Sequence, residues 1–480
     1  MNRIFLLLLT INLVVSPLFP QDVSSKKTLD QFSQYYNSGD YHSISSMYSD
    51  EMQSILPSKK NIDFLSRLKS YAGNITDKEL IKIHNEAVSS YKISFAKIIL
   101  TLDISINDNG QIDIFLLKPF KEYVVKRISY TNDLTNLSKE QSELIFSQIK
   151  GFPNNTQLAI AFIKNGDAMF YGVLNKDGCI MRIDNEDKVF EIGSISKVFT
   201  ATLLANTVLE GNIGLKENIN KYYNFPFSEN INVPFESLAN HTSGLCQYPS
   251  NLDIVSSLMH NLEVGISNPY QQYDEKKIDS YLKSELELQN EPYNKYAYSN
   301  FGFGLLGYTL EKVENTSYER LLQNKIFNKY GMLNSCTNIN QVGTGLVKGL
   351  DNEGTETVNW EWNTSTLLGA GSILSTVSDL AKFALAQFNT NNKELTMTRT
   401  PTFTINEKIK VGLGWHIITT ENDKELHWHN GGTGGYSSSM LLDIENKNGV
   451  IILSNVSAFN PNKENIDNLC FGLIQTLNKY

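Results

Sequence analysis

The stretch EIGSISKVFTATLLANTVLEGN, residues 191–212, places a glycine directly before a long apolar helical pattern. Gly193 interrupts the preceding chain, and the helical pattern begins at Ser194. Apolar residues fall on nearly every face of this predicted helix, and Gly211 is well placed to end it. Because a helix that is apolar all round is buried, the stretch predicts a buried helix with Ser194 at its amino-terminal end.

Ser194 and Lys197 are three residues apart, so they lie on the same side of this helix. Burial disfavours the ammonium form and is expected to lower the pKa of Lys197. An uncharged or proton-sharing lysine can take the proton of a neighbouring serine hydroxyl, and a helix amino terminus favours negative charge near Ser194. The spacing alone is weak support, because it recurs at Ser24, Ser66, Ser89, Ser94, Ser147 and Ser280.

A second candidate motif is Tyr298-Ser299-Asn300, directly before an apolar helical pattern over residues 301–310. A phenol that faces a lysine can move protons as a general base and acid. Asn300 is placed to orient Lys197 or to bind a substrate amide. The alternative is a buried tyrosine with a hydrogen-bonded hydroxyl, and the same Tyr-x-Asn spacing also occurs at Tyr35, Tyr130 and Tyr222.

The stretch HWHNGGTGGY, residues 427–436, has three possible interpretations. As a zinc site, His427 and His429 alternate onto one face of a strand, but no third ligand follows at a metal-binding spacing. As a phosphate loop, the stretch lacks the Gly-Lys-Ser/Thr ending and the following helix. We therefore expect no metal and no other cofactor, with a metallohydrolase built on the two histidines as an alternative.

The third interpretation makes His429-Asn430-Gly431 the edge of a strand that lines a catalytic cleft. Gly431 and Gly432 then let a substrate backbone approach closely. The backbone N–H groups of Gly432 and Ser194 are expected to form an oxyanion hole.

In their order along the chain, the motifs that begin at Ser194, Tyr298 and His429 resemble those of the penicillin-recognising serine hydrolases. The nearest branch contains class C β-lactamases, D-alanyl-D-alanine peptidases and related esterases, and the resemblance covers about residues 150–475. It implies an α+β fold, an antiparallel sheet flanked by helices plus a helical region. It also implies acyl transfer, in which Ser194 attacks a carbonyl and Lys197 and Tyr298 move its proton. Further similar segments are residues 238–245, 301–311, 369–383 and 412–415.

One departure from the family pattern bears on the substrate. Many members carry Lys-Thr-Gly or Lys-Ser-Gly on this strand, and the lysine helps to hold a substrate carboxylate, whereas this chain has His429. Imidazole is mostly uncharged at pH 7, so we expect weak carboxylate binding. This disfavours strong β-lactamase activity and favours esters, amides or D-amino-acid peptides, including cell-wall-derived ones. A sensor of the same fold that acylates slowly or not at all is the alternative function.

The first residues have the pattern of an export signal. Arg3 precedes the apolar run Ile4–Val15, which is too short to cross a bilayer but typical of a secretory signal over residues 1–21. We expect a periplasmic or secreted protein with no membrane span after signal removal; an uncleaved anchor is the alternative. The net charge of −9 disfavours nucleic acid as a partner.

The remaining sequence divides into two expected domains. Residues 25–122 predict a small α+β domain that resembles the cone-shaped SnoaL and nuclear-transport-factor type, with a binding, structural or dimerising role. Residues 123–140 are expected to be a linker, and residues 141–480 the hydrolase domain. Helical patterns occupy 29–36, 42–49, 61–70, 139–149 and 466–478, and strand patterns occupy 91–100, 102–106, 111–120, 157–174 with a turn at Asn165-Gly166, 411–418, 425–430 and 449–455.

The cysteines Cys179, Cys246, Cys336 and Cys470 are far apart and form no Cys-x-x-Cys pair. Zinc-ribbon and thioredoxin-like sites are therefore disfavoured. Disulfide pairing in an oxidising compartment and scattered buried thiols both stay open.

Overall fold

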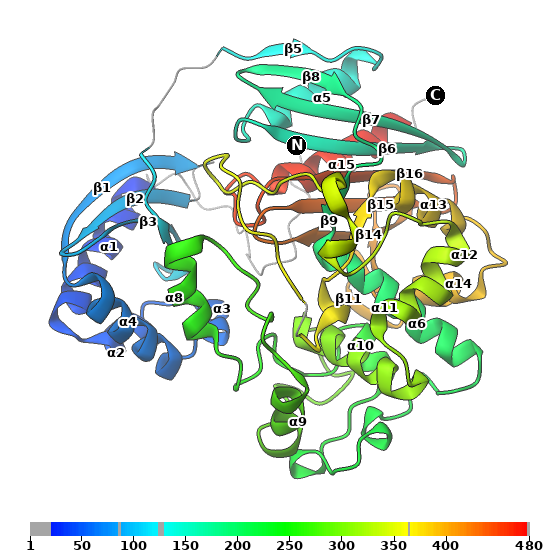
Figure 1. The fold of residues 1–480 in the computed structure, drawn as a ribbon, viewed down its shortest axis with the longest axis horizontal. Coiled ribbons are helices and arrows are strands. Elements are labelled where there is room, and N and C mark those ends of the chain that lie inside the picture. Colours follow the sequence, from blue (N-terminus) through cyan, green and yellow to red (C-terminus); the bar gives the residue numbers. More distant parts are fainter. Residues whose placement is uncertain (1–20, 85–87, 123–128, 363–364, 478–480) are drawn as a thin grey trace. The chain divides into compact units, whose positions relative to one another are not determined.

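The structure is a computed structural model of the chain, and it describes residues 21–84, 88–122, 129–362 and 365–477 (Figure 1). The expected signal peptide therefore lies outside the described residues, apart from Gln21. None of the helices in the described part is both long enough and apolar enough to cross a membrane.

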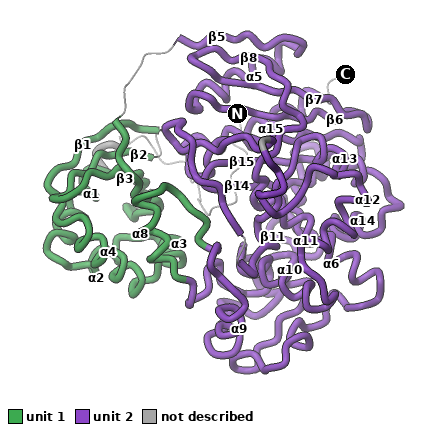
Figure 2. The backbone as a smooth tube through the Cα atoms, in the orientation of Figure 1, with its two compact units in different colours: residues 1–127, 253–269 green, residues 128–252, 270–480 purple. Residues whose placement is uncertain are grey.

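The chain forms two compact units (Figure 2). Unit 1 contains residues 1–127 together with 253–269, and unit 2 contains residues 128–252 and 270–480. The expected hydrolase domain, residues 141–480, thus contains one segment that folds with the amino-terminal unit.

Unit 1 begins with helices and continues with a sheet, as the α+β prediction has it. The sheet is antiparallel, in the order β1-β2-β3-β4. Leu100, Leu102 and Ile104 alternate along β3 and are fully buried or nearly so, as are Phe32 and Leu65 on the helices. A sheet whose alternate residues are apolar buries that face against helices. The elements are α1 (Gln21–Ser38), α2 (Tyr41–Ser45), α3 (Asp50–Ile55), α4 (Ser58–Ala72), β1 (Ile75–His84), β2 (Val88–Phe95), β3 (Ile99–Ile106) and β4 (Ile112–Pro119).

Two strand predictions in unit 1 need correction. The run 91–100, predicted as one strand, contains a tight turn after Phe95, where the Phe95 N–H donates to the Ile98 carbonyl at 2.8 Å. The edge strand β1 was not predicted, because most of its side chains are exposed or half-exposed. A strand without a buried face lacks the alternation that identifies strands in a sequence.

Helix α8 (Ile254–Val264) is the part of residues 253–269 that packs in unit 1, against α4 and β4. Asp253 caps its first turn by accepting a hydrogen bond from the Ser256 N–H at 3.1 Å, and Gly265 ends it with φ +89°. Val255 and Leu262 are buried. The sequence pattern is amphipathic, but it does not indicate which unit the apolar face joins.

Unit 2 is built on a ten-stranded sheet, in the order β11-β12-β13-β14-β15-β16-β6-β7-β8-β5. The two ends of the unit meet where β16 (Asn448–Ser454) pairs with β6 (Thr156–Lys164), and the predicted Asn165-Gly166 turn joins β6 to β7 (Asp167–Lys176). Every residue of β15 (Ser437–Asp443) and β16 is buried, so both faces are covered. The other strands are β5 (Thr131–Asp133), β8 (Cys179–Ile183), β11 (Phe403–Asn406), β12 (Ile409–Val411), β13 (His416–Thr419) and β14 (Glu425–Gly432), with β9 (Val189–Glu191) and β10 (Leu374–Thr376) paired separately.

Helices cover this sheet (Figure 1). Helix α15 (Glu464–Leu477) packs on β15, β16 and α5 (Lys139–Ile149), whereas α13 (Val377–Gln387) packs on β6 and β16. The remaining helices are α6 (Ser196–Leu209), α7 (Phe235–Ala239), α9 (Glu275–Ser284), α10 (Asn300–Glu314), α11 (Tyr318–Leu322), α12 (Asn328–Tyr330) and α14 (Lys393–Arg399).

Two predictions in unit 2 are also corrected. Within the expected linker 123–140, β5 pairs in parallel with β8 and extends the sheet, although all three of its residues are exposed. The run 411–418, predicted as one strand, turns at Gly414, where φ is +73°. Both errors have one cause, since neither a polar edge strand nor a turn inside an apolar run alters the hydrophobic pattern. Residues 123–128 of the linker lie outside the described residues.

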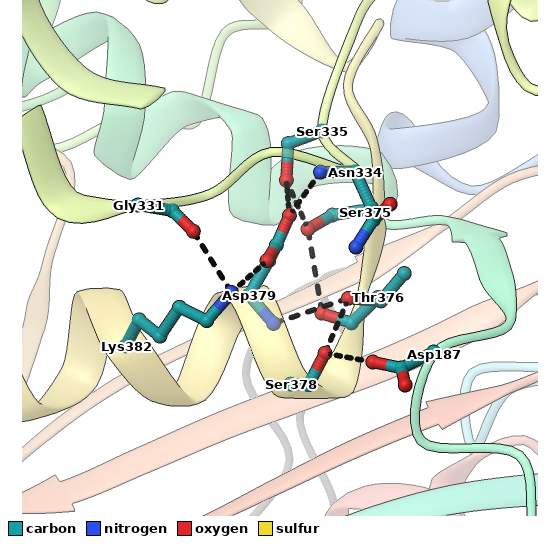
Figure 3. Close-up of polar contacts among 9 residues, drawn as sticks. All are labelled: Asp187, Gly331, Asn334, Ser335, Ser375, Thr376, Ser378, Asp379 and Lys382. Atoms are coloured by element: carbon teal, nitrogen blue, oxygen red, sulfur yellow. Dashed lines mark hydrogen bonds and ion pairs between the residues drawn. The ribbon is translucent and has the colours of Figure 1, made fainter. Parts of the chain in front are cut away.

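A buried carboxylate fixes the start of α13 (Figure 3). Thr376 caps the helix, because its hydroxyl accepts a hydrogen bond from the Asp379 N–H at 3.1 Å. The fully buried Asp379 carboxylate accepts hydrogen bonds from the Asn334 N–H, the Ser335 hydroxyl and the Lys382 amine at 2.7–3.0 Å. Because a buried charge needs such partners, this cluster ties α13 to the loop after α12.

The four cysteines are free thiols. Cys336 and Cys470 are buried, and Cys179 and Cys246 are partly exposed.

Candidate active site

Ser194 lies in a tight 3-10 turn, Gly193–Ile195, that leads into α6. The predicted helix thus begins two residues later than expected, and its first two turns are buried on all sides. Gly193 has φ +53°, and a Cβ atom there would lie 2.4 Å from the Gly432 nitrogen. Only glycine fits at this point, so the turn lies directly against the end of β14.

Gly431, the preceding residue of β14, lies equally close to the turn. A Cβ atom on Gly431 would lie 2.0 Å from the Ile192 carbonyl oxygen and 2.8 Å from the Ser194 nitrogen. The Ser438 hydroxyl, on β15, donates to the same Ile192 carbonyl at 2.8 Å and so links the sheet to the residues before Ser194. The two glycines predicted to line the cleft therefore lie beside the backbone of the predicted nucleophile.

Lys197 is fully buried, and its amine contacts three oxygen atoms. They are the Ser194 hydroxyl at 2.9 Å, the Asn300 side-chain carbonyl at 2.8 Å and the Ala370 main-chain carbonyl at 2.6 Å. None of the three carries a negative charge. Burial therefore lowers the pKa of Lys197 well below its ordinary value.

Two of these contacts determine how an uncharged Lys197 amine is oriented. The Asn300 and Ala370 carbonyl oxygens can only accept hydrogen bonds, so they take the two protons of an NH₂ group. The nitrogen lone pair is then left for the third contact, the Ser194 hydroxyl. The geometry suits removal of the serine proton by the lysine.

Tyr298 contacts both Ser194 and Lys197. Its hydroxyl shares a hydrogen bond with the side chain of Ser194, and its ring centroid is 5.0 Å from the Lys197 amine. Burial raises the pKa of Tyr298 above its ordinary value, although the bond to Ser194 opposes this. The phenol therefore keeps its proton near neutral pH and can donate it, whereas the unprotonated lysine is the better base.

The His241 ring packs against the Tyr298 ring. The two ring centroids are 4.2 Å apart, and His241 Nδ1 accepts a hydrogen bond from the Ser299 N–H at 3.0 Å. Ser299 in turn caps α10, because its hydroxyl accepts from the Gly302 N–H at 2.8 Å. The histidine thus orients the Tyr298–Asn300 segment and contacts neither Ser194 nor Lys197 by a hydrogen bond among the described residues.

His429 is fully buried on β14, and its Nδ1 lies 2.6 Å from the Asn430 carbonyl oxygen. Within the described residues its Nε2 has no hydrogen-bond partner. Burial above all, together with the neighbouring His416, lowers the pKa of His429, so the ring is uncharged at neutral pH. His429 therefore carries no positive charge at the position where the family pattern has a lysine.

His427 lies on the same face of β14 and contacts the Trp415 ring, at 6.3 Å between centroids. Burial lowers its pKa to about 4. Among the described residues, no group of three histidine, cysteine, aspartate or glutamate side chains is arranged to hold a metal ion.

Sequence reasoning missed an aromatic group beside these residues. Tyr270 stacks on Tyr248 with 5.7 Å between ring centroids and on Trp362 with 6.1 Å. The Tyr270 hydroxyl also shares a hydrogen bond with the side chain of Asn300. These aromatic residues belong to polar loops without a motif or periodicity, so the sequence carries no local signal for them.

The comparisons with known proteins agree with this arrangement. A sequence model described as β-lactamase matches residues 155–469, and a model described as a protein of unknown function, DUF3887, matches residues 30–115. Penicillin-binding protein 4* of Bacillus subtilis strain 168 is 27% identical over 292 residues, which cover 56% of this chain. That match covers 61% of the relative, so the chain spans less than two thirds of its length.

Two solved structures share the fold. The octameric penicillin-binding protein homologue from Pyrococcus abyssi aligns with a TM-score of 0.58 and 23% identity, covering 72% of this chain and 77% of that one. The β-lactamase/D-alanine carboxypeptidase from Pseudomonas syringae aligns with a TM-score of 0.56 and 18% identity, covering 70% and 98%. At these identities the likeness concerns the fold alone.

Proposed function

This chain belongs to the β-lactamase family of serine hydrolases, and on that premise we propose that it cleaves an ester, amide or D-amino-acid peptide bond through an acyl-enzyme on Ser194. The observation that carries the proposal is the set of Lys197 contacts. The carbonyl oxygens of Asn300 and Ala370 accept hydrogen bonds from its amine, and the third contact is the Ser194 hydroxyl. Such a base–nucleophile pair is the requirement for covalent catalysis.

In the acylation step, the Ser194 hydroxyl gives its proton to the Lys197 amine while its oxygen forms a bond to the substrate carbonyl carbon. The carbonyl electron pair moves to oxygen, and we propose that the backbone N–H groups of Ser194 and Gly432 stabilise that oxyanion. The tetrahedral intermediate then expels the leaving group. That group receives a proton from Tyr298, which regains one from the lysine ammonium.

In the deacylation step, water attacks the acyl-enzyme and loses its proton to the same lysine–tyrosine pair. The carbon–oxygen bond to Ser194 breaks, the serine recovers a proton, and the carboxylic acid product leaves. Only a water molecule is consumed beyond the substrate, so the cycle requires no cofactor.

The substrate class follows from His429. Because its ring is buried and uncharged at neutral pH, it offers no positive charge to a substrate carboxylate. Asn300 contacts Lys197 at 2.8 Å, and we propose that it also binds a substrate amide. We infer a preference for esters, amides or D-amino-acid peptides, small molecules or cell-wall fragments, over penicillins.

Two parts of the proposal concern the whole protein. The apolar run after Arg3 supports export to the periplasm or outside the cell. For the amino-terminal unit, a sheet packed with helices, we propose a binding, structural or dimerising role.

The decisive experiment is labelling with a fluorophosphonate probe. Wild-type protein is expected to be labelled and Ser194→Ala is not. Ser147→Ala is the matched control, because Ser147 has the same spacing to Lys150 but lies exposed on α5. Absence of wild-type labelling, or equal labelling of Ser194→Ala, would refute the proposal.

Intact mass spectrometry then ranks the substrates and tests the alternative of a sensor. The protein is exposed to a p-nitrophenyl ester, a D-Ala-D-Ala peptide and a penicillin. A hydrolase forms a transient ester adduct and returns to its original mass. A stable penicillin adduct without turnover of the other two compounds would favour the sensor.

A further inference from the structure

The ring of His429 is fixed in one tautomer. Its Nδ1 lies 2.6 Å from the main-chain carbonyl oxygen of Asn430, and a carbonyl oxygen can only accept a hydrogen bond. The ring is fully buried and uncharged at neutral pH, so it has a single N–H group. That hydrogen is therefore on Nδ1, and Nε2 carries the lone pair. The second nitrogen of His429 can accept a hydrogen bond but cannot donate one.

Asn430, the residue that orients this ring, is itself held in place. Its side chain lies on the opposite face of β14, where the amide donates to the Asp467 carboxyl group on α15 at 2.8 Å. Its backbone is paired with Ser439 of β15. The carbonyl that takes the Nδ1 hydrogen therefore has a fixed position, and a change of tautomer in His429 would cost this hydrogen bond.

The His429 side chain lies on the face of β14 that meets the Ser194 turn. His429 and Gly431 are two residues apart on the strand, so their side-chain positions share one face. A Cβ atom on Gly431 would lie 2.8 Å from the Ser194 nitrogen, so this face is the one that the turn contacts. Lys197 is among the titratable groups near the imidazole. His429 is therefore part of the wall beside the nucleophile.

The lone pair on His429 Nε2 has no donor among the described residues, and the atom is shielded from solvent. The ring of His416 is 5.6 Å away between centroids, but its own Nε2 is bonded to the Tyr296 hydroxyl at 2.8 Å. Buried polar atoms nearly always have a partner, because one without a partner costs folding free energy. An unpaired acceptor on the wall of a reaction site indicates a ligand that brings a donor.

His429 therefore differs from the lysine of the family pattern in hydrogen-bond polarity as well as in charge. A lysine ammonium donates to a substrate carboxylate. The lone pair of His429 would face the lone pairs of that carboxylate, and neither group has a hydrogen to share. A carboxamide or a hydroxyl offers an N–H or O–H at the same place, and it enters a buried site at lower cost because it is uncharged.

We propose that His429 Nε2 accepts a hydrogen bond from a neutral donor on the substrate. The substrates of this chain then carry a carboxamide or a hydroxyl where penicillins carry a carboxylate. The inference rests on the proposed function, because it names the substrate class of the Ser194 site. His429 is a specificity-determining residue in this scheme and takes no part in the proton transfers.

Three esters of N-acetyl-D-alanine separate hydrogen-bond polarity from charge. Their leaving groups are glycolamide, which is a neutral donor, N,N-dimethylglycolamide, which is a neutral acceptor, and glycolate, which is a charged acceptor. We expect kcat/KM to be about tenfold higher for the glycolamide ester than for the dimethyl compound, the value of one hydrogen bond. The glycolate ester is expected to be slowest. Equal rates for the two neutral esters, or a fastest glycolate ester, would overturn the inference.

His429→Leu removes the acceptor and keeps an apolar side chain at this buried position. The ratio of kcat/KM between the two neutral esters is expected to fall to about one, because the hydrogen bond is lost. His427→Leu is the matched control, since His427 is also buried on this face of β14 but contacts the Trp415 ring, at 6.3 Å between centroids. It is expected to keep the wild-type ratio. A ratio that stays at its wild-type value in His429→Leu would overturn the inference.

The ring nitrogen resonances of His429 give a measurement without turnover, in the Ser194→Ala variant. We expect a protonated Nδ1 and an unprotonated Nε2 in the free protein at neutral pH. The glycolamide ester is expected to shift the Nε2 resonance, and the dimethyl compound is not. A protonated Nε2, the same shift with both esters, or neither binding nor turnover of any of the three esters would contradict the inference. Fluorophosphonate labelling of the wild type is read first, and its absence would defeat the proposed function instead.

Discussion

The two units each bury a lysine, and the two lysines are held in opposite ways. In unit 1, Lys118 on β4 forms an ion pair with Asp103 on β3, at 2.9 Å between amine and carboxylate, and both residues are buried. In unit 2, Lys197 is surrounded by uncharged acceptors. A buried ammonium that has a carboxylate stays charged and structural, whereas one without it tends to lose its proton.

Replacing each lysine with methionine is the strongest test of this difference. Lys197→Met is expected to lower kcat/KM about 10³- to 10⁴-fold, because the base is lost, and to raise thermal stability, since an amine no longer has to be buried without a counter-charge. Lys118→Met takes the cation away from the buried Asp103 carboxylate and should cost about 3–5 kcal/mol of unfolding free energy. Ester hydrolysis and chemical denaturation measure both effects. Equal activity loss in the two variants would contradict the assignment.

Asn300→Asp is expected to give Lys197 a carboxylate partner, as Lys118 has in Asp103. A carboxylate 2.8 Å from the amine would stabilise the ammonium and raise the pKa of Lys197. We expect kcat/KM at pH 7 to fall about 100-fold and to recover partly as the pH rises, because deprotonation then requires higher pH. The pH dependence of ester hydrolysis tests this, and a loss that is independent of pH would argue against lysine as the base.

Glu191 extends the comparison to a buried acid. Burial raises its pKa to about 7, while Asn359 and the Trp360 N–H donate to its carboxylate at 2.9 Å. Its folded pKa is above the unfolded value, so its stabilising contribution is present below the unfolded pKa of 4.5 and is lost as the pH rises through about 7.

Glu191→Gln is therefore expected to flatten the dependence of stability on pH between 4.5 and 7. Between pH 4 and pH 8 the wild type should lose about 3 kcal/mol of unfolding free energy more than the variant does. Urea unfolding at several pH values gives the measurement. A parallel slope in both proteins would assign the pH dependence to another group.

The smallest expected effect concerns His429. His429→Lys returns a cation to the strand, and we expect acylation by a penicillin to rise about tenfold relative to an uncharged ester, the value of one charge-assisted contact. His427→Lys on the same strand serves as the control. An unchanged ratio of the two rates would show that carboxylate recognition does not depend on this position.

Several features of this protein could be predicted from its sequence because they are local. The buried helix after Gly193, the Ser194–Lys197 spacing and the Asn165-Gly166 turn depend on neighbours within a few residues. Strands without a buried alternating face, such as β1 and β5, could not be found in this way.

The tertiary structure alone decided which distant residues meet. Asn300 reaches Lys197 across 103 positions, Tyr270 reaches Asn300 from a loop without a motif, and α8 joins the unit that precedes it. Periodicity and spacing describe one element at a time, whereas these contacts depend on how apolar faces of separate elements pack together. The sequence therefore determined that a buried lysine lies beside the serine, and the packing determined which distant carbonyl groups surround that lysine.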